Sequence, residues 1–353
     1  MNGFGNESTH NRIEWIDFAR GVVIILMLVG HSNPPEGVWH FIYGFHVPFF
    51  FILSGYLYNK EKWEKLGFKE LLKSRLKTYI VPYFGLSLIN LLINIPYEWY
   101  RGIRGGALRA STFSHLEWIL YSLGQNDKVP NCTPLWFLPA LFVGTVLLYF
   151  ILKIENVFMQ ASICAVCLWP VRILASFSVR QLPWHIDIAT MGMGFMLVGF
   201  YIARYKLLSK KINLFCIIVI ILVASDVIFE NPIIDLNNRV VNDVYLTTVG
   251  ASLMSFALML LCQKYCKKQN PISYLGQNTL IVMAFNFAIN TYMSVIWKHI
   301  PLLGKYEFTW WKILIADIVF CYLLVFLWRL LAKKLPIMNT IGGTHSYNAN
   351  KEG

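Results

Sequence analysis

Residues 13–31 read IEWIDFARGVVIILMLVGH, a largely apolar run. An α-helix needs about 20 apolar residues to cross about 30 Å of hydrocarbon, so this stretch predicts a membrane-spanning helix. Further apolar runs of similar length follow along the chain. We therefore predict an all-α, polytopic transmembrane helix bundle with about ten spans, at roughly residues 13–31, 38–58, 79–97, 134–152, 157–175, 184–204, 213–230, 244–263, 272–297 and 310–331.

The composition of the 353-residue chain agrees with a membrane protein. Apolar residues make up 56% and charged residues only 14%, whereas about a quarter of the residues in soluble domains are charged. The formal net charge of +12 does not indicate a nucleic-acid partner, because basic residues collect in the cytoplasmic loops of membrane proteins. The expected partner of the protein surface is the lipid bilayer.

The distribution of basic residues predicts the orientation of the chain. With the N-terminus inside, the inner loops and tails hold 20 Lys and Arg residues and the outer loops hold 10. This bias predicts cytoplasmic termini and an external segment at 98–133 with a short helix near 115–123. We predict a polar N-terminal tail at 1–11, a membrane domain at 12–332 and a cytoplasmic tail at 333–353. No internal repeat and no paired interrupted helices are evident.

The seven cysteines do not suggest a disulfide framework, since most lie inside apolar runs and Cys132 alone falls in an outer loop. Cys164 and Cys167 have the spacing of a metal-binding pair. A second pair and a nearby histidine are both missing from the sequence around them, so no metal site is predicted.

The first span carries ionisable side chains, which are costly inside a membrane and so are candidate functional groups. Asp17, Arg20 and His31 fall on one helix face, with His31 about 16 Å along the axis from Arg20. A structural interpretation also fits. Asp17 and Arg20 would then pair one turn apart, and the histidine would reach the interface.

The second span carries another histidine. The short turn at 32–37 makes the first two spans an antiparallel hairpin, and His46 lies about two turns inside the membrane. An imidazole at that depth needs a polar partner. The spacing alone is equally consistent with a buried structural histidine and with a functional one.

Five motifs occur in order along the chain: WIDFARG at 15–21 followed by Gly30-His31, FHVPFFFILSGY at 45–56, VPY at 81–83 after a basic loop, PLWFLPALF at 134–142, and ISYLGQNTL at 272–280. This order resembles the acyltransferase-3 family of membrane acyltransferases, and specifically its fucose 4-O-acetylase-like branch. Arg20 and His31 match the family's R-x10-H pairing. The chain departs from the family at Asn286, where members often carry a histidine.

The resemblance implies that the protein transfers an acyl group, usually acetyl, from cytoplasmic acyl-CoA to a hydroxyl of an external carbohydrate or glycolipid. A base must take the hydroxyl proton during attack, and a neutral imidazole suits that role. His31 is the expected base. His46 is the second candidate, as base or as donor to the thioester oxygen. Arg20 stays protonated, so it would orient the donor or bond to Asp17.

The basic loop at 60–77 is expected to hold the phosphates of acyl-CoA through Arg75, Lys73 and Lys77. Ordinary positive-inside topology also explains most of these charges. The residues expected to bind the acceptor substrate are Trp136, Asp187 and Ser54, at or near the motifs. Trp136 also fits an interfacial aromatic belt, and Asp187 also fits an acidic residue at a helix start.

Two other classes of function compete with the O-acyltransferase. One is a transporter or flippase whose His and Asp residues form a proton relay. The other is a membrane receptor for a small molecule or lipid, without chemistry. The ordered motifs favour the enzyme, and the acceptors of such enzymes predict a location in the cell membrane, the inner membrane of a bacterium. The sequence does not define the acceptor sugar or the acyl group.

Overall fold

The computed structural model describes residues 13–123, 133–177, 179–231, 233–266, 268–299 and 309–343. Within these ranges the regular structure is helical, apart from one isolated β-bridge between Asp235 and Val240. The all-α prediction is therefore confirmed. The predicted tail at 1–11 and Cys132 lie outside the described residues.

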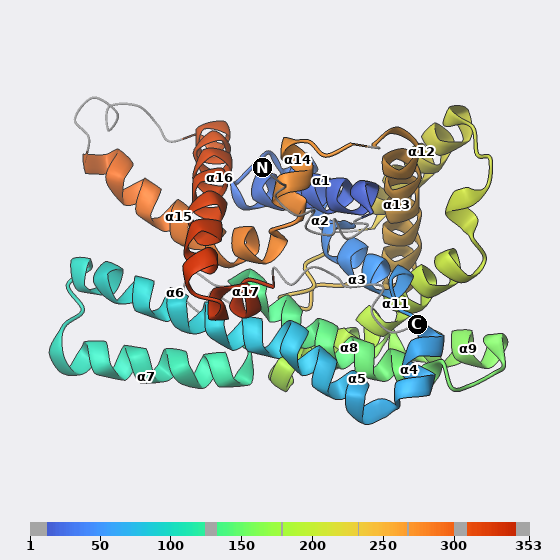
Figure 1. Ribbon diagram of the computed structural model, residues 1–353, viewed down its shortest axis with the longest axis horizontal. Coiled ribbons are helices and arrows are strands. Elements are labelled where there is room, and N and C mark those ends of the chain that lie inside the picture. Colours follow the sequence, from blue (N-terminus) through green and yellow to red (C-terminus); the bar gives the residue numbers. More distant parts are fainter. Residues whose placement is uncertain are drawn as a thin grey trace, which may run out of the picture.

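The helices are given in chain order, and the two halves of the chain interleave in the bundle (Figure 1). The first half contains α1 (Glu14–His31), α2 (Glu36–Tyr43), α3 (His46–Tyr56), α4 (Lys60–Leu66), α5 (Phe68–Arg75), the π-helix η1 (Leu76–Ile80), α6 (Val81–Tyr100), α7 (Gly105–Tyr121), η3 (Thr133–Trp136) and α8 (Phe137–Ile151). The second half contains α9 (Val157–Cys167), α10 (Pro170–Ser176), η4 (Pro183–His185), α11 (Ile186–Arg204), η5 (Leu207–Ser209), α12 (Leu214–Glu230), α13 (Val244–Tyr265), α14 (Pro271–Gly276), α15 (Thr279–His299), α16 (Trp310–Lys334) and α17 (Ile337–Ile341).

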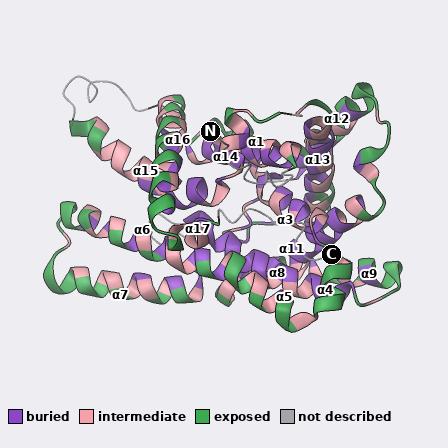
Figure 2. Ribbon diagram, viewed as in Figure 1, coloured by how far each residue is buried: buried purple, intermediate pink, exposed green. Residues whose placement is uncertain are grey.

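Eight helical segments of the described chain are long and apolar enough to cross a membrane. The other two predicted spans correspond to α1, which carries Glu14, Asp17 and Arg20, and to α12, which has only 17 residues. Figure 2 shows α8 and α11 largely buried, whereas α7 and α16 consist mostly of exposed and intermediate residues. Exposed apolar side chains such as Phe215 on α12 and Val319 on α16 suit contact with lipid. The count of ten spans and the cytoplasmic termini remain predictions.

The second predicted span is interrupted rather than continuous. α2 ends at Tyr43, and α3 begins at His46 after Phe45, whose φ and ψ are −147° and −16°. Pro48 provides the reason, because a proline removes the hydrogen bond to the carbonyl four residues back and its ring clashes with that carbonyl. The interruption places His46 at the first position of a helix, inside the bundle.

The predicted span at 272–297 is interrupted too, between α14 and α15. Arg329 of α16 covers this break, since its guanidinium donates to Asn278 Oδ1 and to Gln277 Oε1, both at 3.1 Å. The sequence indicated neither interruption.

Two helix pairs approach closely because glycines face the partner backbone. A Cβ at Gly276 of α14 would lie 1.7 Å from the Asp17 carbonyl oxygen of α1. A Cβ at Gly199 of α11 would lie 1.8 Å from the Ile52 carbonyl oxygen of α3. Only glycine permits these contacts, which therefore fix α1 and α3 within the bundle.

The predicted inner loop at 60–77 is largely helical. α5, η1 and α6 form one continuous helical segment, Phe68–Tyr100, and the π-helical turn begins directly after Arg75. The helix predicted within 98–133, α7, begins at Gly105, ten residues before the predicted start, and packs along α6 (Figure 1). At the other end of the chain, α17 packs against α6 and α16.

Candidate active site

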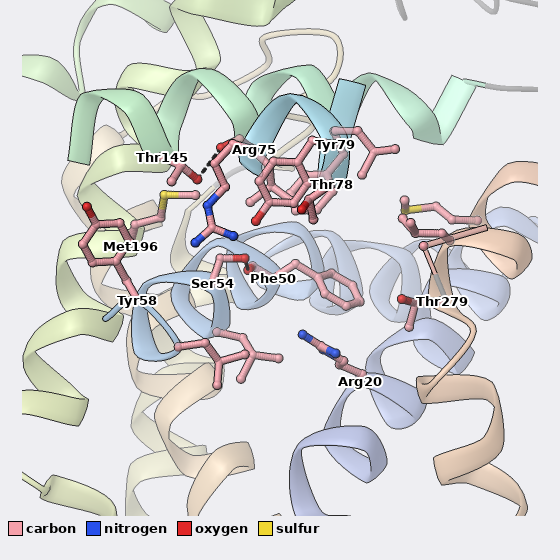
Figure 3. Close-up of a pocket in the computed structure, with 18 of the residues that line it drawn as sticks. Arg20, Phe50, Ser54, Tyr58, Arg75, Thr78, Tyr79, Thr145, Met196 and Thr279 are labelled. Atoms are coloured by element: carbon pink, nitrogen blue, oxygen red, sulfur yellow. Dashed lines mark hydrogen bonds between the residues drawn. The ribbon is translucent and has the colours of Figure 1, made fainter. Parts of the chain in front are cut away.

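The helix bundle contains a cavity that we name the arginine cavity. Its volume is about 220 Å³, and the polar residues that line it include Arg20, Ser54, Tyr58, Arg75, Thr78 and Tyr79. Figure 3 shows Arg20 and Arg75 entering it from opposite sides, with Ser54 and Phe50 of α3 between them. Two guanidinium groups on a single cavity favour an anionic ligand.

The second cavity, the histidine cavity, has a volume of about 150 Å³. Its lining includes His31 at the end of α1, His46 at the start of α3, and Trp136 in η3. The remaining polar lining comes from Tyr43, Thr133, Asp235, Asn237 and Asn238. This cavity therefore combines imidazole groups with aromatic and amide side chains.

The two cavities adjoin. Phe50, Phe137 and Met283 line both of them. These three apolar side chains form a common wall between a region with guanidinium groups and a region with imidazoles. A ligand long enough to pass this wall would contact both.

A hydrogen-bonded chain fixes the protonation of the His31 ring. Asn286 Nδ2 donates to Asp317 Oδ2 at 3.0 Å, and Asn286 Oδ1 faces His31 Nδ1 at 2.7 Å. When the Asp317 carboxyl is ionised it only accepts hydrogen bonds, so the amide presents its oxygen to the histidine. The proton of a neutral His31 therefore sits on Nδ1, and the basic lone pair is on Nε2. Asn286 thus orients an imidazole instead of replacing one.

His46 is held in the same tautomer by the interrupted helix. Its Nδ1 lies 2.9 Å from the Ile42 carbonyl oxygen, which accepts the hydrogen bond. The side chain is buried, and its ring lies 4.8 Å from that of Tyr43. A neutral His46 therefore also carries its lone pair on Nε2, so it suits a base better than a donor to an oxygen.

Arg75 is the one member of the predicted basic set that lines the arginine cavity, whereas Lys73 and Lys77 are exposed away from it. The Arg75 guanidinium stacks over Trp63 at 5.2 Å and lies 5.9 Å from the Tyr79 ring. Its Nε is buried without a hydrogen-bond partner among the described residues. Such a group is suited to an anionic ligand.

The first-span residues separate in the structure. Arg20 lines the arginine cavity and His31 lines the histidine cavity. Asp17 is buried at the contact with α14 and is not among the described residues that line either cavity. Ser54 lies in the arginine cavity, on the opposite side of the common wall from Trp136, with its hydroxyl donating to the Phe50 carbonyl.

Asp187 lies behind the cavities. Its carboxylate pairs with Arg239 at 3.2 Å, and both side chains are buried. Trp136 packs against His185, with ring centroids 4.8 Å apart. Of the two, Trp136 therefore lines the histidine cavity directly, and Asp187 is linked to it through the loop that carries Arg239.

The sequence reasoning missed several residues of this region. Asp317 lies within the apolar run at 310–331, where a lone carboxylate was itself a signal of function. Asp235, Asn237 and Asn238 carry no such signal, because polar residues are ordinary in loops. Among the described residues no group of His, Cys, Asp or Glu side chains is placed to hold a metal.

The helix bundle with its adjoining guanidinium and imidazole cavities has the groups of a membrane-embedded transferase. The family model described as the acyltransferase domain, Acyl_transf_3, matches residues 13–329. The chain therefore belongs to the acyltransferase-3 family and is a membrane acyltransferase. No curated protein and no solved structure matches the chain.

Proposed function

We propose that this acyltransferase moves an acyl group, most simply acetyl, from acyl-CoA to a hydroxyl of a saccharide or glycolipid. The observation that carries the proposal is the common wall of Phe50, Phe137 and Met283. It brings a cavity suited to a phosphate-bearing donor against a cavity that holds two imidazole bases. The fucose 4-O-acetylase-like branch supplies the expected reaction, O-acetylation of a sugar.

The reaction needs one base and no redox partner. Nε2 of His31 takes the proton of the acceptor hydroxyl while the hydroxyl oxygen attacks the thioester carbonyl carbon. The bond between the carbonyl carbon and sulfur breaks, and the imidazolium returns its proton to the departing CoA sulfur. The products are an O-acyl ester and free CoA. Asn286 keeps the reacting tautomer in place.

The donor is assigned to the arginine cavity. Arg75 and Arg20 neutralise phosphate charge, while the apolar lining of the cavity suits the pantetheine arm and the acyl group. The arm passes the common wall and presents the thioester to His31. The acceptor enters the histidine cavity from the external side, in the cell membrane of a bacterium.

A transporter with a proton relay is the competing function. The interrupted spans at Glu36–Tyr56 and at residues 271–299 favour it, because transporters use discontinuous helices around their binding sites. However, the hydrogen-bonded chain from Asp317 to His31 runs through the amide of Asn286, and an amide does not exchange a proton as a carboxylate does. The enzyme therefore accounts for more of the site.

The decisive experiment uses the purified protein in nanodiscs with acetyl-CoA labelled in the acetyl group. We expect label transfer to methyl glycosides, or slow release of CoA in their absence, and loss of both in His31→Gln. Glycoside movement across proteoliposomes without acetyl-CoA, together with no CoA release, would reject the enzyme in favour of transport. Mass spectrometry of surface glycans with and without the gene identifies the natural acceptor.

A further inference from the structure

The loop between α12 and α13 supplies the most polar part of the histidine cavity. Asp235, Asn237 and Asn238 all line the cavity, although the loop lies more than 180 residues along the chain from His46. The catalytic imidazoles come from helices α1 and α3, so this loop is a separate element facing them. Its side chains belong to the class that hydrogen-bonds sugar hydroxyls.

The tip of the loop is a preformed pair of a carboxylate and an amide. Asp235 Oδ2 accepts from Asn238 Nδ2 at 2.7 Å, and Asp235 Oδ1 accepts from the Asn238 backbone N–H at 3.2 Å. Reciprocal backbone hydrogen bonds between Asp235 and Val240 close the turn. The carboxylate retains further lone pairs, and the amide retains its oxygen. Two neighbouring hydroxyls of one ring match these adjacent groups.

Buried contacts hold the loop against the bundle. Arg239 pairs with Asp187 at 3.2 Å and donates to the Val179 carbonyl. Arg239 itself has a φ of 58°, a conformation that non-glycine residues keep only when surrounding contacts enforce it. Gln181 Nε2 donates to the Asn237 carbonyl at 3.0 Å. The tip is therefore placed by side chains that do not touch the cavity.

The base of the loop is fixed as well. Asn231 is buried, its Nδ2 donates to Thr247 Oγ1 at 2.8 Å, and its carbonyl oxygen accepts from His40 Nε2 at 2.8 Å. A loop held at its base and behind its tip presents polar groups in a defined position, which is what recognition of one hydroxyl pattern requires.

The other side of the same cavity is aromatic. Trp136, Tyr43 and Phe287 line it, and such rings pack on the apolar C–H face of a sugar while polar groups bind its hydroxyls. The cavity volume of about 150 Å³ is below the about 300–1,000 Å³ of pockets for drug-sized ligands. It suits one monosaccharide unit, with the rest of a longer acceptor outside.

We propose that Asp235, Asn237 and Asn238 recognise the hydroxyls of a single terminal sugar of the acceptor, and that the Asp187–Arg239 pair positions them. This inference rests on the proposed function and deepens it. The loop selects the acceptor and the hydroxyl that meets His31. Asp187 is then a positioning residue and not a direct sugar ligand.

The test compares wild type with Asn238→Ala in nanodiscs. Acetyl-CoA turnover is measured with methyl glycosides of hexoses and with their monodeoxy analogues, and the glycoside concentration at half-maximal change is recorded. Because Asn238 is exposed, its truncation does not threaten folding. Val240→Ala is the matched control, since Val240 is exposed on the same loop and is not among the residues that line either cavity.

We expect Asn238→Ala to raise the half-maximal concentration of the preferred glycoside about tenfold, the effect of losing about one hydrogen bond. At least one monodeoxy glycoside should have the same half-maximal concentration with wild type and with Asn238→Ala, because it lacks the hydroxyl that Asn238 binds. This comparison is a double-mutant cycle. Asp187→Asn should raise the same concentration with little change in the limiting rate.

Several outcomes overturn the inference. Asn238→Ala with unchanged discrimination against every deoxy analogue would remove the loop from recognition. So would wild-type turnover that no glycoside alters. Absence of acetyl-CoA turnover in wild type has a different meaning, because it rejects the proposed function and the inference together.

Discussion

The arginine cavity is walled mainly by helices that glycine contacts hold in place, whereas the histidine cavity is closed on one side by irregular segments. Gly276 and Gly199 fix α1 and α3 beside the arginine cavity. The η3 turn at Thr133–Trp136 and the loop tip at Asp235 close the histidine cavity. Under the proposed function, the contrast predicts a constant donor cavity and an adaptable acceptor cavity, because loops tolerate change better than packed helices do.

The strongest way to test this division is to remove the base. His31→Ala should lower acyl transfer by about 10²–10⁴-fold, the usual effect of losing a general base. His31→Gln should fail similarly, since glutamine hydrogen-bonds without being basic. Steady-state transfer of labelled acetyl in nanodiscs measures the loss.

Donor binding provides the control, because the arginine cavity does not contain His31. Acyl-CoA should still bind to the His31→Ala protein. Substantial turnover in His31→Gln would show that His31 is not the general base and would assign that role to His46.

A smaller effect is expected when the orientation of His31 is disturbed. Asn286→Ala should lower the rate roughly 10–150-fold, equivalent to the about 1.5–3 kcal/mol of a hydrogen bond to a group that becomes charged. The pH–rate profile should keep its ionisations, because an amide does not titrate near neutral pH.

Asn290→Ala is the matched control for this variant. Asn290 also bonds to Asp317, and its truncation leaves the hydrogen bond between Asn286 and His31 in place. Asn290→Ala should therefore cost less activity than Asn286→Ala. Equal losses would assign both residues to folding of α15.

The donor side should respond in affinity instead of rate. Arg75→Ala should raise the apparent KM for acyl-CoA about tenfold with a smaller change in kcat, because a phosphate contact is made equally in the ground state and transition state. Lys77→Ala should change neither parameter, since Lys77 is exposed away from the cavity. If Arg75→Ala and Lys77→Ala have the same KM and kcat, Arg75 does not bind the donor and serves only as a basic residue of the membrane topology.

The smallest expected effect concerns pH and the helix α7. Burial lowers the pKa of His115, and nearby Glu98, 3.8 Å away, only partly opposes this. The unfolded chain therefore binds more protons than the folded chain, so stability present above about pH 6.5 falls as the pH drops below it. His115→Gln should flatten this dependence in thermal unfolding measured in detergent. If the pH dependence of the unfolding temperature is the same in His115→Gln and wild type, His115 is not its source.

Sequence reasoning was sufficient for the fold class because apolar runs near 20 residues permit little except helices in a bilayer. It also selected His31 and Arg20, because charged and imidazole groups are costly inside a membrane, whereas Arg75 was selected from the family resemblance. All three line a cavity. Helical periodicity placed Arg20 and His31 on one face. Their separation along the axis then assigns them to different cavities.

The remaining features depend on contacts between distant segments. Asn286 acquires its role only from Asp317, 31 residues away, and from His31 across the bundle. Pro48 alone did not predict the interruption before α3, because proline kinks and breaks look alike in sequence. The polar residues of the loop at Asp235 have no periodicity, so nothing in the sequence directs them to a cavity.

The common wall of Phe50, Phe137 and Met283 also bears on the electrochemical gradient across the membrane. A protein that carries a group across a bilayer risks leaking protons and dissipating the electrochemical gradient. A constriction lined by apolar side chains excludes water and so blocks ion conduction, whereas a slender thioester arm can fill it. Under the proposed function, the wall would let acyl transfer cross the membrane without opening a path for ions.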